Sequence, residues 1–343
     1  MTLTTAVTLP TGPPEDCPPV LALDIGGTKL AVAVVTPDGR THGLLVEPTY
    51  RDRGPDDVIP RLFRMGHESI ARAGLAEPIG AVGISCGGPL DARTGVLLGP
   101  LHLPGWTSIP IVAMTEAEYG RPAALANDAS AAALAEVRYG AGIGLDTVVY
   151  MTISTGVGGG LVIHGHLHYG AATNGGEMGH ITVRPGGRQC SCGRRGCLEA
   201  YCSGNNIGRR GAEAARTAES QGTPTQLTTL ETVTAADVAR AAAQGDMIAS
   251  AVWTETTDLL GQAITDLVNI LEPDAVILGG GVTRSGAMLL DPVRDIVKTT
   301  AMGPARQAVD VMLAGLGDEV CVVGAGAIAF DLVRLGRGHH GIR

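Results

Sequence analysis

The sequence predicts an α/β fold built from two related lobes, and two observations support this expectation. Strand and helix patterns alternate along the 343 residues, as they do in α/β proteins. A buried strand, a glycine-rich turn and a second strand occur at residues 20–35 and recur at 147–163, about 130 residues later. Both halves therefore open with an antiparallel meander, which argues against a plain Rossmann domain. We expect a duplicated, bent arrangement with the active site in the cleft between the lobes.

Hydrophobic patterns place the elements within each half. In the first half they predict strands at 20–25, 30–35, near 43–47 and at 79–85, and helices at 56–73 and 130–137. In the second half they predict strands at 147–153, from 161 onward and at 275–278, and helices at 235–243, 246–271 and 321–335. Strands and helices thus alternate through both halves, which is the pattern of α/β proteins.

The composition excludes several classes of protein. Hydrophobic residues make up 45% and charged residues 17% of the chain, which suffices for a packed core and argues against disorder. The formal net charge of −9 disfavours a nucleic-acid partner, because binding to a phosphate backbone needs a basic face. No apolar run approaches the roughly 18 residues of a membrane span. The opening residues lack a signal-peptide pattern, and the odd number of cysteines suits a reducing compartment, so we expect a cytoplasmic location.

Three thiols lie within eight residues, at Cys190, Cys192 and Cys197. Glycines between them let so short a loop turn its sulfurs toward one point. Thiolates and one imidazole are the ligands of a closed tetrahedral zinc site, and His180, ten residues upstream, is the natural fourth ligand. The spacing favours a structural zinc ion over a disulfide. We expect the solitary cysteines to be core residues, and these are Cys17, Cys86, Cys202 and Cys321.

A turn that reads Asp-Ile-Gly-Gly-Thr-Lys at residues 24–29 joins the first two predicted strands. Bare glycine backbone can approach a phosphate closely, and its N–H groups donate to the oxygens. The residues expected at the phosphate are Gly26, Gly27, Thr28 and Lys29. Asp24 is expected to hold Mg²⁺ through water, because hard cations prefer oxygen ligands. The alternative interpretation is an ordinary β-hairpin, in which Gly-Gly is a common turn.

Two further glycine turns favour phosphate binding over a simple hairpin. Ser-Thr-Gly-Val-Gly-Gly-Gly at 154–160 and Leu-Gly-Gly-Gly-Val at 278–282 each follow an apolar strand. Neither turn matches the P-loop or the dinucleotide-binding motif, so both of those interpretations fail. We expect the three turns together to bind a nucleotide, with Mg²⁺.

Asn127 and Asp128 precede an Ala-rich helix, and the sequence allows two roles for Asp128. Asp often caps a helix N-terminus, which is the structural interpretation. The functional interpretation is a general base that takes a proton from a sugar hydroxyl and orients that hydroxyl toward a γ-phosphate. Asn127 has both a donor and an acceptor with which to bind a neighbouring hydroxyl.

Carboxylates bracket the cysteine cluster, at Glu177 and Glu199. Carboxylates are good partners for vicinal hydroxyls, although Glu177 also fits a solvated loop. If one ring nitrogen of His180 binds zinc, the other is free for substrate in a fixed tautomer. Three alternating histidines, at His164, His166 and His168, would share one face of a strand. A second metal site there is less expected than an ordinary surface.

The order of these motifs resembles that of the ROK family of bacterial sugar kinases and repressors, which includes glucokinases, fructokinases and N-acetylmannosamine kinases. The resemblance covers roughly residues 20–330. It rests on D-I-G-G-T-K, G-G-P-L-D, N-D-A, S-T-G-V-G-G-G, G-G-E-M-G-H, C-S-C-G-R-R-G-C-L-E and L-G-G-G-V, in that order. Together the seven motifs are highly specific.

The resemblance implies a role for each matching residue. Asp128 would be the catalytic base. The residues that would bind the sugar are Gly87, Gly88, Asn127, Asp128, Glu177, His180 and Glu199. The residues that would bind ATP are Asp24, Gly26, Gly27, Thr28, Lys29, Thr155, Gly156, Gly279 and Gly280. The residues that would bind structural zinc are His180, Cys190, Cys192 and Cys197.

The resemblance also implies a fold of the actin–hexokinase (ribonuclease H-like) type, usually dimeric, with lobes that close over sugar. We expect a flexible tail at 1–19, a small lobe at 20–125, and a larger lobe at 126–320 with a zinc loop at 180–199. A C-terminal helix within 321–343 is expected to pack back onto the small lobe. We expect no membrane or nucleic-acid partner. We expect the protein to form a homodimer.

The implied activity is ATP-dependent phosphorylation of a hexose at its 6-hydroxyl, as in a glucokinase. An amino sugar such as kanosamine, N-acetylmannosamine or N-acetylglucosamine is the alternative substrate. The family often has Pro-Gly-Pro after the strand at 79–85, whereas this chain has Cys86-Gly87-Gly88-Pro89, so the sugar-pocket wall differs. A sugar-sensing regulator without kinase activity is less expected, because about 20 residues before Val20 are too few for a helix-turn-helix module.

Overall fold

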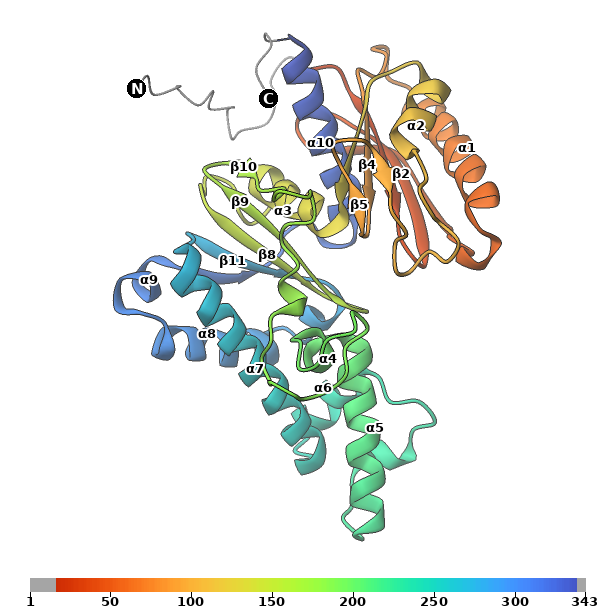
Figure 1. Ribbon diagram of the computed structural model, residues 1–343. Coiled ribbons are helices and arrows are strands. Elements are labelled where there is room, and N and C mark those ends of the chain that lie inside the picture. The colour runs from red at the N-terminus through yellow and green to blue at the C-terminus, as the bar shows by residue number, and fades with distance from the viewer. Residues whose placement is uncertain (1–16, 338–343) are drawn as a thin grey trace. The chain divides into compact units, whose positions relative to one another are not determined.

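The structure of the protein is a computed structural model (Figure 1), which describes residues 17–337. These residues form two compact units. Unit 1 comprises the described residues up to Asp146, residues 160–176 and the chain from Gly315, and unit 2 comprises 147–159 and 177–314. Of the predicted tail, residues 1–16 lie outside the described residues, as do 338–343 of the predicted C-terminal segment.

The first sheet lies in unit 1 and has the order β3-β2-β1-β4-β7. Its strands are β1 (Val20–Ile25), β2 (Lys29–Val35), β3 (Thr41–Pro48), β4 (Val82–Cys86) and β7 (Ala123–Asn127). The first three strands form an antiparallel meander, and β4 and β7 continue from β1 in parallel. A small separate ribbon is made by β5 (Leu90–Asp91) and β6 (Val96–Leu97).

The second sheet has the order β10-β9-β8-β11-β12. Its strands are β8 (Val148–Ile153), β9 (Val157–Ile163), β10 (His166–Leu167), β11 (Ala275–Gly279) and β12 (Asp310–Leu313). The boundary between the units falls within β9. Here too a parallel strand, β11, pairs with the first strand of the meander, β8. The two sheets therefore repeat one strand order, which confirms the predicted duplication.

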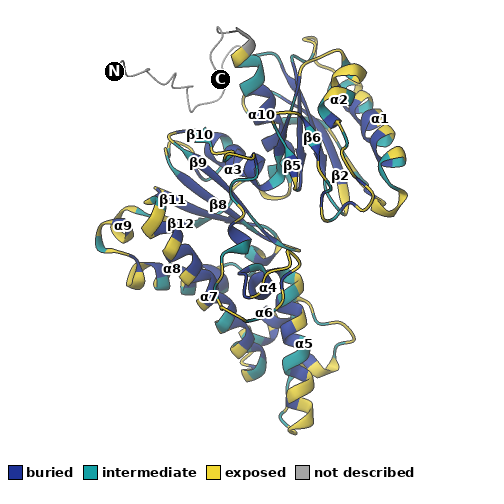
Figure 2. Cartoon of the chain, in the orientation of Figure 1, coloured by how far each residue is buried: buried dark blue, intermediate teal, exposed yellow. Residues whose placement is uncertain are grey.

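Alternation along β1 gives the first sheet two different faces. Leu21, Leu23 and Ile25 pack with α1 (Pro55–Ala73), whereas Val20 and Ala22 belong to the cluster with α10 (Val320–Arg337). The face toward α10 consists largely of small residues, so helix and sheet approach closely. All of β1 and β4 is buried between these layers (Figure 2). Helix α2 (Ile111–Tyr119) lies near β4, β6 and β7.

The expected lobe boundary at residue 125/126 is wrong, because the helix that follows it belongs to unit 1. Helix α3 (Asp128–Tyr139) packs against α10. Buried Arg138 donates to the Ala327 carbonyl at 2.7 Å and also pairs with Asp331. Glu136, fully buried, accepts backbone N–H bonds from Gly315 and Leu316 at 3.0 Å each. These contacts bind α3 to the C-terminal segment that starts at Gly315, so the chain leaves unit 1 only after residue 146.

Unit 2 is mainly helical outside its strands. Its helices are α4 (Glu199–Cys202), α5 (Gly204–Ser220), α6 (Ala235–Ala243), α7 (Met247–Leu271), α8 (Ala287–Thr300) and α9 (Gly303–Ala308). Asp246 caps α7 by accepting from Ile248 N and Ala249 N, as the predicted helix start implies. Cys202 is buried with its thiol 3.5 Å from the Thr256 carbonyl, which confirms the expected core role. Across residues 17–337, no helix combines the length and apolar character that crossing a bilayer demands.

Candidate functional site

Three parallel strands of unit 1 end at one edge of the first sheet and bring the predicted residues of this unit together. Asp24 on β1 is in register with Ser85 on β4, and Ser85 with Ala126 on β7. The segments that follow these strands are therefore neighbours, since carboxyl ends of parallel strands share one sheet edge. These segments carry the turn at 24–29, the Gly87–Gly88 pair and the Asn127–Asp128 pair.

Asp24 is a buried carboxyl group at the centre of this edge. Ser85 donates its hydroxyl to Asp24 Oδ1 at 2.6 Å. The pKa of Asp24 is raised to about 7, chiefly by burial and in smaller part by the nearby charge of Asp128, while the Ser85 hydrogen bond and the charge of Lys29 act in the opposite direction. Asp24 therefore titrates near neutral pH in the protein without a bound cation.

The turn at 26–28 is held from two sides. Gly26 N donates to the Lys29 carbonyl at 3.0 Å, and a Cβ at Gly26 would lie only 2.8 Å from that oxygen, so glycine is required there. From the other side, Thr49 donates its hydroxyl to the Gly26 carbonyl at 2.6 Å and its N–H to the Thr28 carbonyl at 3.0 Å. The turn is thus fixed before any ligand binds.

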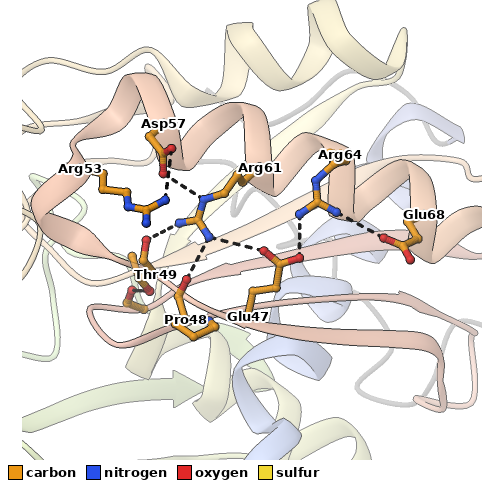
Figure 3. A network of polar contacts seen from close by, with 9 residues as sticks. Glu47, Pro48, Thr49, Arg53, Asp57, Arg61, Arg64 and Glu68 are labelled. Atoms are coloured by element: carbon orange, nitrogen blue, oxygen red, sulfur yellow. Dashed lines mark hydrogen bonds and ion pairs between the residues drawn. The ribbon is translucent and has the colours of Figure 1, made fainter.

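A network of charged residues on α1 and β3 supports Thr49 in turn (Figure 3). Arg61 donates to the Thr49 and Pro48 carbonyls and pairs with Asp57 at 3.0 Å. Glu47 pairs with Arg64 at 2.7 Å and with Arg61 at 3.4 Å. The network places a rigid layer behind the glycine turn, far in sequence from the turn itself.

The structure separates the two roles that the sequence left open for Asp128. Asn127 is the N-cap of α3, because its Oδ1 accepts from Ala129 N at 3.0 Å and from Ser130 N at 3.4 Å. Asp128 is the first residue of the helix and accepts from Ala129 N at 2.8 Å. The cap is therefore Asn127, which leaves its Nδ2 as the group for a ligand, and Asp128 is not needed as a cap.

In unit 2, the four predicted metal ligands form one cluster, with their ligand atoms all within 4.8 Å of one another. His180 Nδ1 lies 3.6 Å from Cys190 Sγ, and Cys192 Sγ lies 3.7 Å from Cys197 Sγ. A tetrahedral zinc ion at its usual bond lengths needs separations of about 3.6 Å and about 3.8 Å for such pairs. A disulfide would need about 2.05 Å, and all three cysteines are free thiols. The donor set therefore fits zinc.

The two carboxylates that bracket this cluster are held differently. Glu177 Oε2 lies 3.7 Å from His180 Nε2, the ring nitrogen that faces away from the cysteine cluster. Glu199 accepts from Val157 N at 3.0 Å and from the Ser191 hydroxyl at 3.1 Å. The cysteine loop thus aligns His180 and fixes Glu199 through Ser191 in the same unit.

The two glycine turns of unit 2 lie against each other. Gly279 on β11 is in register with Thr152 on β8, so both turns follow adjacent parallel strands. Gly280 has φ of 89° and a Cβ there would lie 2.5 Å from the Ile153 carbonyl, so only glycine fits. The predicted nucleotide-binding residues Thr155 and Gly156 follow Ile153 after one residue, Ser154.

The alternating histidines do not form a second metal site. His164 pairs with Asp146 at 2.7 Å, in the tight turn between β9 and β10. Among residues 17–337, the His180 cluster alone assembles three or more ligand groups suited to a metal ion. The interpretation of His164, His166 and His168 as a second metal site, which was the less expected one, is therefore wrong for this part of the chain.

Comparisons with known proteins agree with this arrangement. A profile of the ROK family matches residues 20–331. The chain belongs to the ROK family. It is 33% identical to a glucokinase of Thermotoga maritima over 309 residues, which is 90% of this chain and 96% of that protein. It is 33% identical to an N-acetylmannosamine kinase of Shigella boydii over 314 residues, which is 90% of this chain and 97% of that protein.

A crystal structure of a ROK family glucokinase from Streptomyces griseus, in complex with glucose and AMPPNP, is similar in fold. It has a TM-score of 0.76 and 31% identity, over 91% of this chain and 99% of that one. The expected family and its two-lobed α/β fold class are thereby confirmed.

Several residues that shape this ROK site were not predicted from the sequence. Ser85, Thr49 and Ser191 each hold a predicted residue by a hydrogen bond. Ser85 and Thr49 stand outside the seven motifs, and Ser191 lies within the cysteine motif but was not assigned a role. The side-chain amide of Asn174 accepts a hydrogen bond from Leu90 N and donates one to the Leu90 carbonyl, and it lies beside Gly88. For Ser85, Thr49 and Asn174 the neighbouring sequence gives no signal, because their contacts join segments that are far apart in the chain.

The raised pKa of Asp24 predicts a dependence of stability on pH. The pKa is about 7 in the folded protein and 3.8 as its ordinary value, so protonation stabilises the folded state. That stabilisation is complete below about pH 3.8 and is lost as the pH rises through 7, by roughly 3 kcal/mol between pH 5 and 8. Asp24→Asn should remove this difference. Urea unfolding of both proteins at pH 5 and pH 8, with exposed Asp52→Asn as control, measures it; equal pH slopes would contradict the assignment.

Proposed function

We propose that this protein transfers the γ-phosphoryl group of ATP to the 6-hydroxyl of a hexose. One observation carries the proposal: Asp128 stands at the same sheet edge as the glycine turn at 24–29, and Asn127 has taken over the capping role that would otherwise explain Asp128. The glucokinases to which the chain is similar supply the substrate class.

In this proposal Asp128 accepts the proton of the sugar hydroxyl as that oxygen attacks phosphorus. A carboxylate suits this step because it orients the hydroxyl by a hydrogen bond and then removes its proton. Burial disfavours the charged form of Asp24 beside it, so the two carboxyls need not both be charged when no cation is present.

Each unit carries groups that suit sugar hydroxyls. Asn127 offers its Nδ2, and Gly87 and Gly88 offer backbone. Glu177, His180 and Glu199 offer two carboxylates and an imidazole, aligned by the cysteine loop. Carboxylates accept hydrogen bonds from hydroxyls and can each hold two of them. Such a set favours a polyhydroxylated substrate.

The cofactors follow from the same residues. ATP phosphates would be bound by Gly26, Gly27, Thr28, Lys29, Thr155 and Gly156, and adenosine would lie beside Gly279 and Gly280. Asp24 would hold Mg²⁺ through a water molecule. The oxygen that would bind this water is the one that accepts no hydrogen bond from Ser85. Magnesium supplies neutralisation of phosphate charge. Zinc bound by His180, Cys190, Cys192 and Cys197 supplies a structural brace for the sugar-binding loop.

A coupled assay of ADP release across a panel of hexoses and amino-hexoses tests the proposal. Sugar-dependent ADP release, with a product phosphorylated at oxygen 6 by NMR, is the expected result. If no sugar stimulates ADP release while sugars still bind, the protein is a sugar-sensing regulator and not a kinase. The expected homodimer stays a prediction, which light scattering of the purified protein checks.

An amino-hexose is the second candidate substrate. The chain is as similar in sequence to an N-acetylmannosamine kinase as it is to a glucokinase, and this similarity supports an amino-hexose as a candidate substrate. Gly87 stands where the family often has proline, so this wall of the sugar site differs in shape. A ratio of kcat/KM that favours an amino-hexose over glucose in the same panel would assign the protein to that class.

A further inference from the structure

The loop between β6 and α2 places a histidine at the centre of the unit 1 site. Leu98 N donates to the Pro89 carbonyl at 3.0 Å, and Leu101 N donates to the Gly88 carbonyl at 3.3 Å, so the loop is bonded to the Gly88–Pro89 segment. Leu103 and Trp106, each 1% exposed, anchor the loop in the core. The residue between these fixed points is His102.

The imidazole of His102 lies between two glycines of the site. A Cβ at Gly87 would lie 2.0 Å from His102 Cε1 and 2.8 Å from Nε2. A Cβ at Gly27 would lie 2.9 Å from His102 Cδ2 and 3.0 Å from its Cβ. The ring therefore occupies space that side chains at both positions would need. Neither glycine has a positive φ, so the backbone does not explain their presence, but the ring does.

The two ends of the His102 ring face different segments of the site. Its carbon edge packs on Gly27 of the phosphate-binding turn, and its Cε1–Nε2 end faces Gly87 of the sugar-binding segment. On the neighbouring glycine, a Cβ at Gly88 would lie 3.5 Å from Asn127 Nδ2 and from Asn174 Oδ1. No hydrogen bond joins the His102 ring to another described residue. The polar end of a half-buried imidazole thus stands ready for a partner at the sugar-binding segment.

We propose that His102 is a specificity-determining residue, whose imidazole hydrogen-bonds a ring hydroxyl of the sugar beside Gly87. The proposal rests on the proposed kinase function. A neutral imidazole offers one donor and one acceptor, so it distinguishes a hydroxyl from a hydrogen at that carbon. The small residue at Gly87 is the complement of this ring, because any side chain there would displace it. This pairing explains why the wall differs from the Pro-Gly-Pro that the family often has.

Measurements of kcat/KM for the preferred hexose and its singly deoxygenated analogues test the assignment. The wild-type enzyme should discriminate against each analogue that lacks a bound hydroxyl. In His102→Ala the discrimination at one ring position should fall about tenfold, since one hydrogen bond to the sugar is lost, while it stays unchanged at the other positions. His102→Asn should recover part of it. A uniform loss for all sugars, or no change, would overturn the proposal.

Gly87→Ala provides an independent probe, because all three nearest atoms to its added Cβ belong to His102. This variant should displace the ring and lose the same discrimination as His102→Ala. In the double variant Gly87→Ala should add nothing further, since the space is then empty. Additive losses in the double variant would contradict the pairing of these residues.

Exposed His168→Asn in the same unit is the matched control and should behave as wild type. Melting temperature and zinc content of each variant separate a local effect from misfolding. A wild-type enzyme that phosphorylates no sugar would refute the proposed function. An active wild type whose discrimination is insensitive to His102 would refute only this inference.

Discussion

Replacing Asp128 with asparagine should lower kcat about 10³-fold while the protein keeps its fold and its affinity for sugar. General base catalysis contributes roughly 10²–10⁴-fold, and an amide cannot accept the proton of the attacking hydroxyl. The fold should be unaffected because Asn127, not Asp128, caps α3. The coupled ADP assay gives kcat, and calorimetric titration with sugar gives the dissociation constant.

Asp52→Asn is the matched control, because Asp52 is an exposed carboxylate of the same unit outside the site. This variant should keep wild-type turnover. Near-normal turnover in Asp128→Asn would remove Asp128 from its role. A loss of sugar affinity with kcat unchanged would instead make it a binding residue.

Replacing Cys192 with serine should remove the zinc ion and raise the KM for sugar by about 10- to 100-fold. A hydroxyl is a poor substitute for a thiolate in a tetrahedral site, and such sites depend on all four ligands. Without the metal, the His180 ring loses the partner at Nδ1 that fixes its tautomer and direction. Glu199 would also lose order, because Ser191 in the same loop holds it.

Atomic absorption measures the zinc content of the variant, and initial rates at varied sugar concentration give its KM. Cys17→Ser, outside the cluster, is the control and should retain zinc. Full activity in a metal-free Cys192→Ser protein would show that the loop needs no metal. If the variant loses zinc and only its KM for ATP increases, the cysteine loop contributes to nucleotide binding and not to sugar binding.

The strands and turns that carry the site were predictable because each is marked by local sequence. Strand β1 is a continuous apolar run and ends in a glycine turn, so both its burial and its end were visible. The cysteine spacing likewise identified a metal cluster, and the structure places all four ligand groups together. Helix α2, by contrast, was missed, because its nine residues carry no amphipathic pattern.

The lobe boundary was predicted wrongly for a related reason. Helix α3 follows the last strand of the first sheet, and the sequence shows no sign that it packs against a helix at the other end of the chain. Arg138 makes that contact through Asp331, and Glu136 binds the backbone of Gly315 just before that helix. A buried ion pair between residues so far apart leaves no local pattern.

The sequence by itself determined the repeated unit of strand, glycine turn and strand, the ROK motifs and the ligand set of the metal cluster, since each is encoded in neighbouring residues. The tertiary structure alone decided which residue caps α3, that burial moves the pKa of Asp24 to about 7, and that His102 fills the space beside Gly27 and Gly87. These properties arise from contacts between segments distant in the chain. Only their packing sets the distance, the burial and the direction of each group.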